Sequence, residues 1–366
     1  MSSSDAALTP TEQSSVSQLA DLGVYILSGR IKAPAQGLTQ GADADRLGLR
    51  RAWLSERYDL KEAGAILGGV GALTQRLGLA TCAIAPGSRH PLLTAALGAT
   101  MQATYGPRFT LGIGRGIAAV LEPQGMREFT FAATEDYVSI VRRLWRGETV
   151  SYDGPAGTFP QLKLVDGLSV DPPDIWSVNI GGRLASQAAA RSFDGVFLTP
   201  FLTPKAVAQT RAWIDEECER IGRDPAQVRI CQPIVTAPEM DSDRIRNEAH
   251  ARAITYFQMP GIWRQYRDLN GWDPEVFDSV RNHRMFTNLE RSGSADQHFT
   301  RDALAEPARL VPDEWVAQTC AVGAIGDCLA TLASFKDAGA DELSIYGTTP
   351  AENAALIEAW RAHTGQ

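Results

Sequence analysis

The stretch Arg108-Phe-Thr-Leu-Gly-Ile-Gly-Arg-Gly116 decides the fold, together with Leu77-Gly-Leu-Ala-Thr-Cys-Ala-Ile-Ala-Pro86 upstream of it. Each is a short apolar run that ends in small residues, glycine or proline. A buried parallel strand has this pattern where it opens into a functional loop. Residues 90–105, between the two runs, read as one helix. The order strand, helix, strand therefore predicts a parallel βαβ unit.

The same alternation continues along most of the chain and predicts an α/β fold, a (β/α)₈ TIM barrel with its site at the strand C-termini. A hairpin is expected within 148–165, outside this alternation. A charged helical insertion between strands seven and eight, at about 241–318, is too long for an ordinary connection. It either forms a lid and substrate pocket or serves packing and dimer formation. The eight expected strands are 22–29, 51–58, 79–84, 109–114, 174–181, 194–198, 229–237 and 342–346.

Residues 1–20 form a polar, serine-rich leader without the features of a signal peptide, and 21–366 form one domain. The formal net charge of −8 argues against broad binding to nucleic acid or to an anionic membrane. No apolar run reaches transmembrane length. Five scattered cysteines lack CxxC spacing, and no histidines are spaced as metal ligands. We therefore expect a cytoplasmic protein with reduced thiols and no metal.

Five motifs follow one another in order along about residues 22–347. They are Trp53-Leu-Ser-Glu56, Arg108-Phe-Thr-Leu-Gly-Ile-Gly114, Asn179-Ile-Gly-Gly-Arg183 with Asp194-Gly195, Val322-Gly-Ala-Ile-Gly326 and Gly339-Ala-Asp-Glu-Leu343. This ordered set resembles the bacterial-luciferase-like barrels, and within them the oxidoreductases that use coenzyme F420, a deazaflavin. The resemblance implies that the deazaflavin, or FMN as the alternative, lies across the C-terminal mouth of the barrel. It also implies a homodimer.

In this family a bulge on strand three, often with a non-prolyl cis peptide, lies behind the cofactor ring. The matching bond is Cys82–Ala83, and both side chains are small, as such a surface requires. The alternative for Cys82 is a simple buried hydrophobic residue. The resemblance also places Gly112 and Gly114, after strand four, at the border of the cofactor.

The segment Asn179, Ile180, Gly181, Gly182 and Arg183 matches the family's site for the cofactor phosphate. The residues give a physical reason for this assignment. Glycines allow close approach of the backbone to an anion, and the N–H groups of a following helix point toward it. A tight turn without a ligand is the alternative. Arg183 either adds charge to the site or points to solvent.

Glu56 and Arg57 end predicted strand two, where a barrel displays reactive residues. Many relatives carry an acidic residue followed by histidine here, so Arg57 is a departure. Arginine stays protonated and cannot act as a general base. We expect Glu56 to handle a proton or contact the cofactor, and Arg57 to steady negative charge. The alternative is a salt bridge between the two that closes the strand end.

Ile117 is a second departure, since sugar-phosphate dehydrogenases of the family have an acidic residue at the matching position. An apolar residue there favours a less polar substrate. The sequence therefore predicts hydride transfer between F420 and a small, fairly apolar organic molecule. The alternatives are an FMN-dependent monooxygenase of the same superfamily and a non-catalytic deazaflavin-binding protein.

Overall fold

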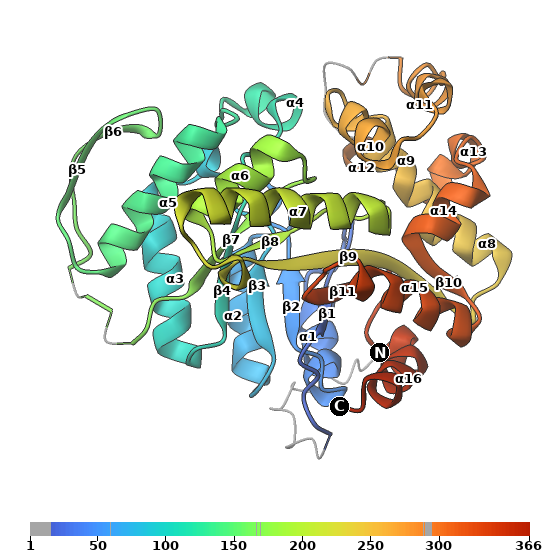
Figure 1. Cartoon of the computed structure of the whole chain (residues 1–366), viewed down its shortest axis with the longest axis horizontal. Helices are drawn as coiled ribbons and strands as arrows, with labels where there is room; N and C mark the ends of the chain where they lie inside the picture. Colours follow the sequence, from blue (N-terminus) through green and yellow to red (C-terminus); the bar gives the residue numbers. More distant parts are fainter. Residues whose placement is uncertain (1–15, 59, 166, 169, 288, 290–294) are drawn as a thin grey trace, which may run out of the picture.

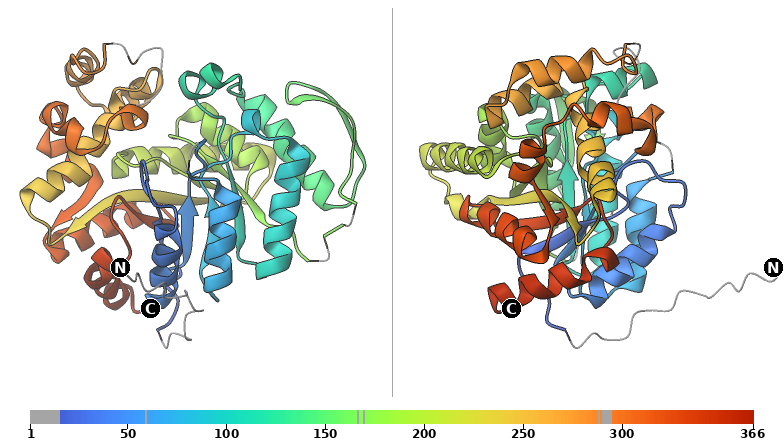
Figure 2. Two further views of the ribbon diagram at one scale, coloured as in Figure 1. Left: turned by 180° about the vertical axis from the view of Figure 1, so that it is seen from behind. Right: turned by 90° about the vertical axis from the view of Figure 1, so that its right-hand side faces the viewer.

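The computed structural model describes residues 16–366 except 59, 166, 169, 288 and 290–294. Eight parallel strands close into a barrel, with each strand paired to the next around the ring and β8 paired to β9 to complete it. Outer helices surround these strands in all three views (Figures 1 and 2). The barrel strands are β1 (Leu22–Tyr25), β2 (Arg51–Leu54), β3 (Gly78–Thr81), β4 (Phe109–Ile113), β7 (Asp174–Val178), β8 (Gly195–Phe197), β9 (Arg229–Pro238) and β11 (Glu342–Tyr346).

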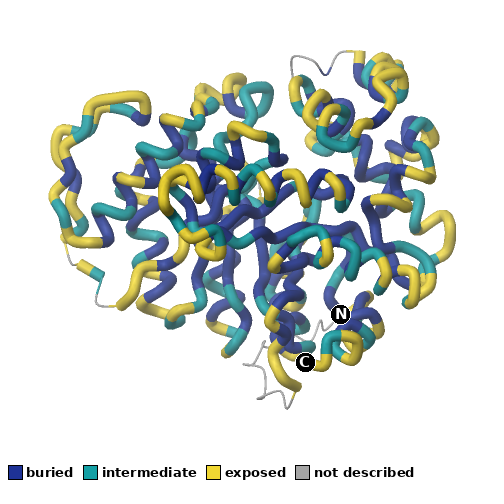
Figure 3. The backbone as a smooth tube through the Cα atoms, viewed as in Figure 1, coloured by how far each residue is buried: buried dark blue, intermediate teal, exposed yellow. Residues whose placement is uncertain are grey.

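Most helices of the outer layer follow a barrel strand, as parallel strands require a crossover connection. Their apolar faces and the outward faces of the strands form one large buried cluster, which appears as the dark interior of Figure 3. The outer helices are α1 (Gln36–Arg46), α2 (Ala63–Leu73), α3 (Pro91–Tyr105), α5 (Phe131–Trp145), α6 (Arg183–Ser192), α7 (Pro204–Ile221), α15 (Ile325–Asp337) and the C-terminal α16 (Ala354–Thr364).

The inside of the barrel is filled by a separate small cluster of side chains from five strands. Trp53 and Trp176 lie with ring centroids 5.3 Å apart, and Phe197 packs on Trp53 at 4.4 Å. Ala80, Cys82 and Cys231 complete the cluster. The barrel is therefore a packed core, as TIM barrels generally are, and the site lies beyond its end.

Two regions of the chain depart from the alternation of strands and helices. The hairpin β5 (Val150–Gly154) and β6 (Gly157–Leu162) reaches away from the barrel beside α5, and α4 (Ala118–Leu121) follows β4 (Figure 1). The chain between β9 and β11 forms a helical group on the opposite side. Its helices are α8 (Ser242–Ile245), a π-helical turn (Arg246–His250), α9 (Ala251–Phe257), α10 (Ile262–Asn270), α11 (Pro274–Arg281), α12 (Ala295–His298), α13 (Ala305–Ala308) and α14 (Asp313–Thr319).

Several local predictions need correction. Strand two ends at Leu54, so Glu56 and Arg57 lie in the loop that follows it. The apolar periodicity predicts a helix over 134–146, but α5 begins earlier, at Phe131, because the Thr130 hydroxyl caps it by accepting from the Ala133 N–H at 3.1 Å. Leu19, within the predicted leader, is buried.

A ninth strand, β10 (Cys320–Gly323), was not predicted. It pairs in parallel with the last four residues of β9, Val235–Pro238, on the edge of β9 that β8 leaves free after Cys231. No pattern in the sequence indicates this pairing, because four residues that end in Val-Gly look like the approach to helix α15.

Candidate active site

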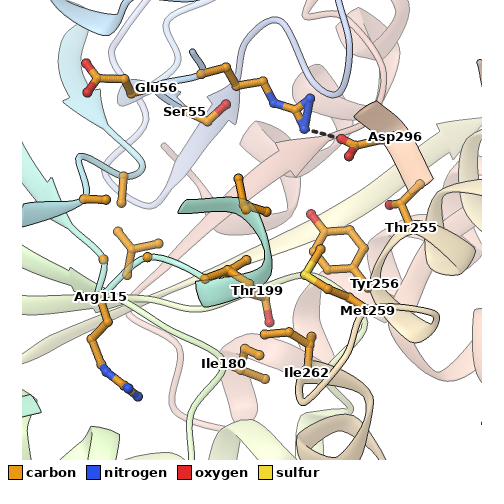
Figure 4. A pocket seen from close by; sticks show the side chains of 18 of the residues that line it. Ser55, Glu56, Arg115, Ile180, Thr199, Thr255, Tyr256, Met259, Ile262 and Asp296 are labelled. Atoms are coloured by element: carbon orange, nitrogen blue, oxygen red, sulfur yellow. Dashed lines mark hydrogen bonds and ion pairs between the residues drawn. The ribbon is translucent and has the colours of Figure 1, made fainter. Parts of the chain in front are cut away.

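A cavity of about 1090 Å³ lies at the C-terminal ends of the barrel strands, between the strand loops and the helical group (Figure 4). Its position is the one at which TIM barrels carry their sites. Seven of the predicted site residues line it: Glu56, Arg57, Ala83, Gly114, Asn179, Ile180 and Gly181. Four others are not among the described lining residues: Cys82, Gly112, Gly182 and Arg183.

Glu56 stands at the edge of the cavity and is 9% exposed. Its carboxylate accepts a hydrogen bond from the Arg89 guanidinium at 2.7 Å. Burial raises the pKa of Glu56 above its ordinary value, while the charge of Arg89 acts in the opposite direction. A raised carboxyl pKa brings the group closer to working as a proton donor or acceptor near neutral pH.

Arg57 forms an ion pair with Asp296 of α12, across the cavity from the β2 loop (Figure 4). The salt bridge between Glu56 and Arg57 that the sequence left open is therefore not formed, since each residue pairs elsewhere. This contact joins the barrel to the helical group over the site. The Arg57 guanidinium lines the cavity, where an anionic oxygen can approach it.

The Cys82–Ala83 peptide is cis, at the bond that the resemblance indicated. The two residues face different surroundings. Ala83 lines the cavity, whereas Cys82 packs in the barrel interior with Trp53 and Trp176. Burial raises the pKa of the Cys82 thiol well above its usual value, so it stays protonated. Cys82 therefore has the surroundings of a buried hydrophobic residue.

Gly112 and Gly114 also differ in surroundings. A Cβ on Gly112 would lie 1.9 Å from the Thr81 carbonyl oxygen, so glycine is needed there for β3 and β4 to approach. Gly114 lines the cavity, and its Cβ would come within 3.1 Å of the Ala83 Cβ. A cofactor contact remains our prediction for both, and the geometry favours Gly114.

The Asn179–Arg183 segment forms a tight turn into α6. The Asn179 side-chain oxygen accepts from the Gly181 N–H at 2.7 Å. Gly181 and Gly182 have φ of +96° and +90°, and no heavy atom lies within 4 Å of a Cβ built on Gly182. The open backbone before a ten-residue helix fits a phosphate group. Arg183 points outward to Glu216 and is more than half exposed.

Polar residues of the cavity that the sequence analysis did not assign include four with large side chains. Tyr25 and Tyr346 end the neighbouring strands β1 and β11, and Arg252 and Tyr256 come from α9. A phenol at the last position of two barrel strands is a signal that was available in the sequence. The positions of Arg252 and Tyr256 in an insertion gave none.

The remaining wall combines apolar surface with scattered positive charge. Ile117 lines the cavity, as does the end of the α4 turn. The cations in the lining other than Arg57 and Arg252 are Arg30, Lys32, Arg115 and Arg301, and the apolar side chains include Val120, Leu121, Ile180, Met259 and Ile262.

Across the described ranges, no three His, Cys, Asp or Glu side chains gather closely enough to hold a metal ion. Over the same residues, no helix has the length and apolar character to cross a membrane. All five cysteines are free and buried.

A closed parallel barrel with a polar cavity at the strand C-termini defines a TIM-barrel class of protein. The model of the luciferase-like monooxygenase family matches residues 9–342, so the chain belongs to that family. This finding confirms the resemblance inferred from the ordered motifs.

Several proteins with similar sequences are named as F420-dependent enzymes. The F420-dependent glucose-6-phosphate dehydrogenase of Nakamurella multipartita is 31% identical over 54% of this chain and 57% of its own length. The matched region thus spans little more than half of that relative. An oxidoreductase of Mycobacterium tuberculosis named as coenzyme F420-dependent is 27% identical, with 82% of this chain and 86% of that protein covered.

Among solved structures, the coenzyme F420-dependent tetrahydromethanopterin reductase from Methanopyrus kandleri superposes with a TM-score of 0.76. It is 15% identical and covers 94% of this chain and 99% of its own. Monooxygenase RslO1 from Streptomyces bottropensis gives a TM-score of 0.64 at 20% identity, with 94% and 98% covered. These similarities establish the barrel fold.

Proposed function

We propose that this protein is an F420-dependent oxidoreductase that transfers a hydride between the deazaflavin and a small, fairly apolar organic substrate. When bound, the deazaflavin supplies the hydride chemistry, and the protein supplies binding, orientation and electrostatics. The proposal is supported by the F420-dependent names of relatives that match up to 82% of the chain.

The observation that carries the proposal is the open backbone of Gly182 at the start of α6, directly after Gly181, which lines the same cavity as Ala83 and Gly114. Unpaired N–H groups at Gly182 and the first turn would hold the cofactor phosphate. Ala83 and Gly114, which pack closely, would present a flat surface of small residues to the ring. Arg115, in the cavity wall, adds positive charge for an anionic cofactor.

The residues of the β2 loop would act on the substrate side. Glu56, with its raised pKa, would exchange a proton with the substrate or hydrogen-bond to the cofactor. Arg57, held by Asp296, would steady negative charge that develops during the reaction. Ile117 and the neighbouring apolar wall favour a substrate less polar than a sugar phosphate.

Titration of the purified protein with F420 and, separately, with FMN tests the proposal by fluorescence. Tight F420 binding with weak FMN binding is the expected result. Binding of neither would contradict the phosphate site at Gly181 and Gly182.

A second candidate, an FMN-dependent monooxygenase, is favoured by the family model and by RslO1. Preference for FMN, with oxygen consumption by the reduced flavin, would support it instead. Binding of F420 without turnover on a panel of alcohols, ketones and enones would favour a non-catalytic binding protein.

We further propose that the protein is a cytoplasmic homodimer. Light scattering on the purified protein measures the number of chains in the assembly and so tests the dimer.

A further inference from the structure

Two tyrosine hydroxyls, one from the helical group and one from a barrel strand, meet at the wall of the cavity. The Oη atoms of Tyr256, on α9, and Tyr346, at the end of β11, lie 2.9 Å apart. Both residues line the cavity. Figure 4 shows the Tyr256 ring beside Met259, with its hydroxyl directed toward the interior of the cavity. We call these two residues the hydroxyl pair.

The hydroxyl pair always retains a proton for a ligand. Each phenol carries one O–H, and the contact between the two oxygens uses one of them, whichever residue donates it. The other O–H is left to a further acceptor. A pair of this kind both donates to and orients an oxygen atom that enters the cavity.

Neighbouring groups hold the hydroxyl pair in place. The ring of Tyr25 packs edge-on against Tyr346 with centroids 4.8 Å apart. The Arg252 guanidinium lies 4.8 Å from the centroid of the Tyr346 ring and donates to Glu248 at 3.0 Å. Arg252 is 3% exposed, so its charge acts through protein rather than through water.

The surroundings keep the Tyr256 phenol neutral and favour negative charge on an oxygen beside it. Burial raises the pKa of Tyr256 well above its usual value, so its phenol remains protonated. The nearby cation of Arg252 stabilises an oxygen that gains negative charge. Met259 and Ile262 give the adjacent wall an apolar surface.

We propose that the hydroxyl pair binds the reacting oxygen of the substrate and exchanges a proton with it, and that the substrate is an apolar carbonyl compound or the corresponding alcohol. This inference rests on the proposed function, which supplies the hydride. It assigns Tyr256 and Tyr346 as catalytic residues in addition to Glu56.

The proton balance of the step follows from this geometry. In the reducing direction the carbonyl carbon gains a hydride, and the electrons of the C=O π bond move to oxygen. That oxygen takes the proton of the free O–H, which leaves an alcohol and a tyrosinate. The tyrosinate regains a proton from water. In the oxidising direction each transfer is reversed.

The test uses 4-nitrophenol, a planar probe with one acidic oxygen, added to the full-length protein without cofactor. Its affinity and the visible absorbance of its anion are measured for wild type, Tyr256→Phe and Tyr346→Phe. We expect each variant to bind about three- to tenfold more weakly, the loss of one hydrogen bond. The bound anionic fraction should fall as well.

Tyr105→Phe is the matched control, because the Tyr105 hydroxyl donates to the Gly68 carbonyl at 2.6 Å on the helical exterior, away from the cavity. It should bind 4-nitrophenol as wild type does. Thermal melts show whether the two cavity variants remain folded.

An F420 titration of the same four proteins separates the two proposals. If F420 binds and the probe affinity is the same in all four, the hydroxyl pair proposal is overturned and the cofactor proposal stands. If the probe depends on both tyrosines but F420 fails to bind, the proposed function fails and the oxygen site stands. Absence of 4-nitrophenol binding to wild type also overturns the hydroxyl pair.

Discussion

Each end of the barrel buries a carboxylate beside arginine, but the two carboxylates differ in their number of arginine partners and in their access to a cavity. At the closed end, Glu342 is 1% exposed and contacts three guanidinium groups, Arg50 at 2.8 Å, Arg229 at 2.6 Å and Arg51 at 3.5 Å. At the open end, Glu56 has Arg89 and borders a large cavity.

This difference indicates that the closed end contributes to stability, whereas the open end is arranged to contact a ligand. At the closed end Arg51 also lies over the rings of Trp53 and Trp176, at 5.2 and 5.1 Å from their centroids, so the charges are enclosed by packed side chains. At the open end burial raises the pKa of Glu56 and the group keeps access to a ligand. This agrees with the general division of TIM barrels into a stabilising face and a catalytic face.

Removal of the carboxylate at the closed end should have the largest effect on the protein. Glu342→Gln leaves three arginines without their shared partner, and we expect a loss of about 3–5 kcal/mol in the free energy of unfolding. Urea unfolding followed by fluorescence measures it. The control Asp268→Asn alters a 64% exposed carboxylate paired with Arg267 and should unfold as wild type does. Equal stability of the two variants would refute the distinction between the ends.

A change at the open end should affect ligand affinity more than stability. Gly182→Ala adds a Cβ where φ is +90° and open space precedes α6, so we expect about tenfold weaker F420 binding. Gly222→Ala is the matched control, since Gly222 also has positive φ and open space but caps the far end of α7. Fluorescence titration should find its affinity unchanged. An equal loss in both variants would indicate a backbone effect unrelated to the phosphate.

The opposing effects of burial and of Arg89 on the pKa of Glu56 can be tested by the pH dependence of activity. Arg89 lowers the pKa that burial raises, so Arg89→Gln should raise the pKa of Glu56 further. The Glu56-dependent limb of the pH profile of kcat/KM should then move to higher pH. Glu56→Gln should remove that limb altogether. A limb that stays in place in Arg89→Gln would assign the titration to another group.

The smallest effect is expected at Arg183. Its side chain pairs with Glu216 on the surface and is more than half exposed, so Arg183→Gln should change the F420 dissociation constant by less than about threefold. Fluorescence titration beside Gly182→Ala makes the comparison direct. A loss as large as that of Gly182→Ala would show that the arginine turns inward to the phosphate.

The sequence by itself determined the barrel and much of the glycine turn that leads into α6. Short apolar runs ending in glycine mark buried strands within a few residues, and Gly181 and Gly182 permit positive φ wherever the chain places them. These features depend on local backbone geometry and side-chain burial, which neighbouring residues encode. The position of the cis Cys82–Ala83 bond came from the family resemblance.

Only the tertiary structure decided which side chains and which strands contact one another. Arg57 contacts Asp296, 239 residues away, and Tyr256 contacts Tyr346, 90 residues away. Strand β10 forms because β9 extends past the end of β8 and offers an unpaired edge there. Such contacts arise when separate elements pack together, and no local pattern of charge or hydropathy specifies which side chain will face which. The cavity residues that the helical group contributes were therefore the hardest to assign from the sequence.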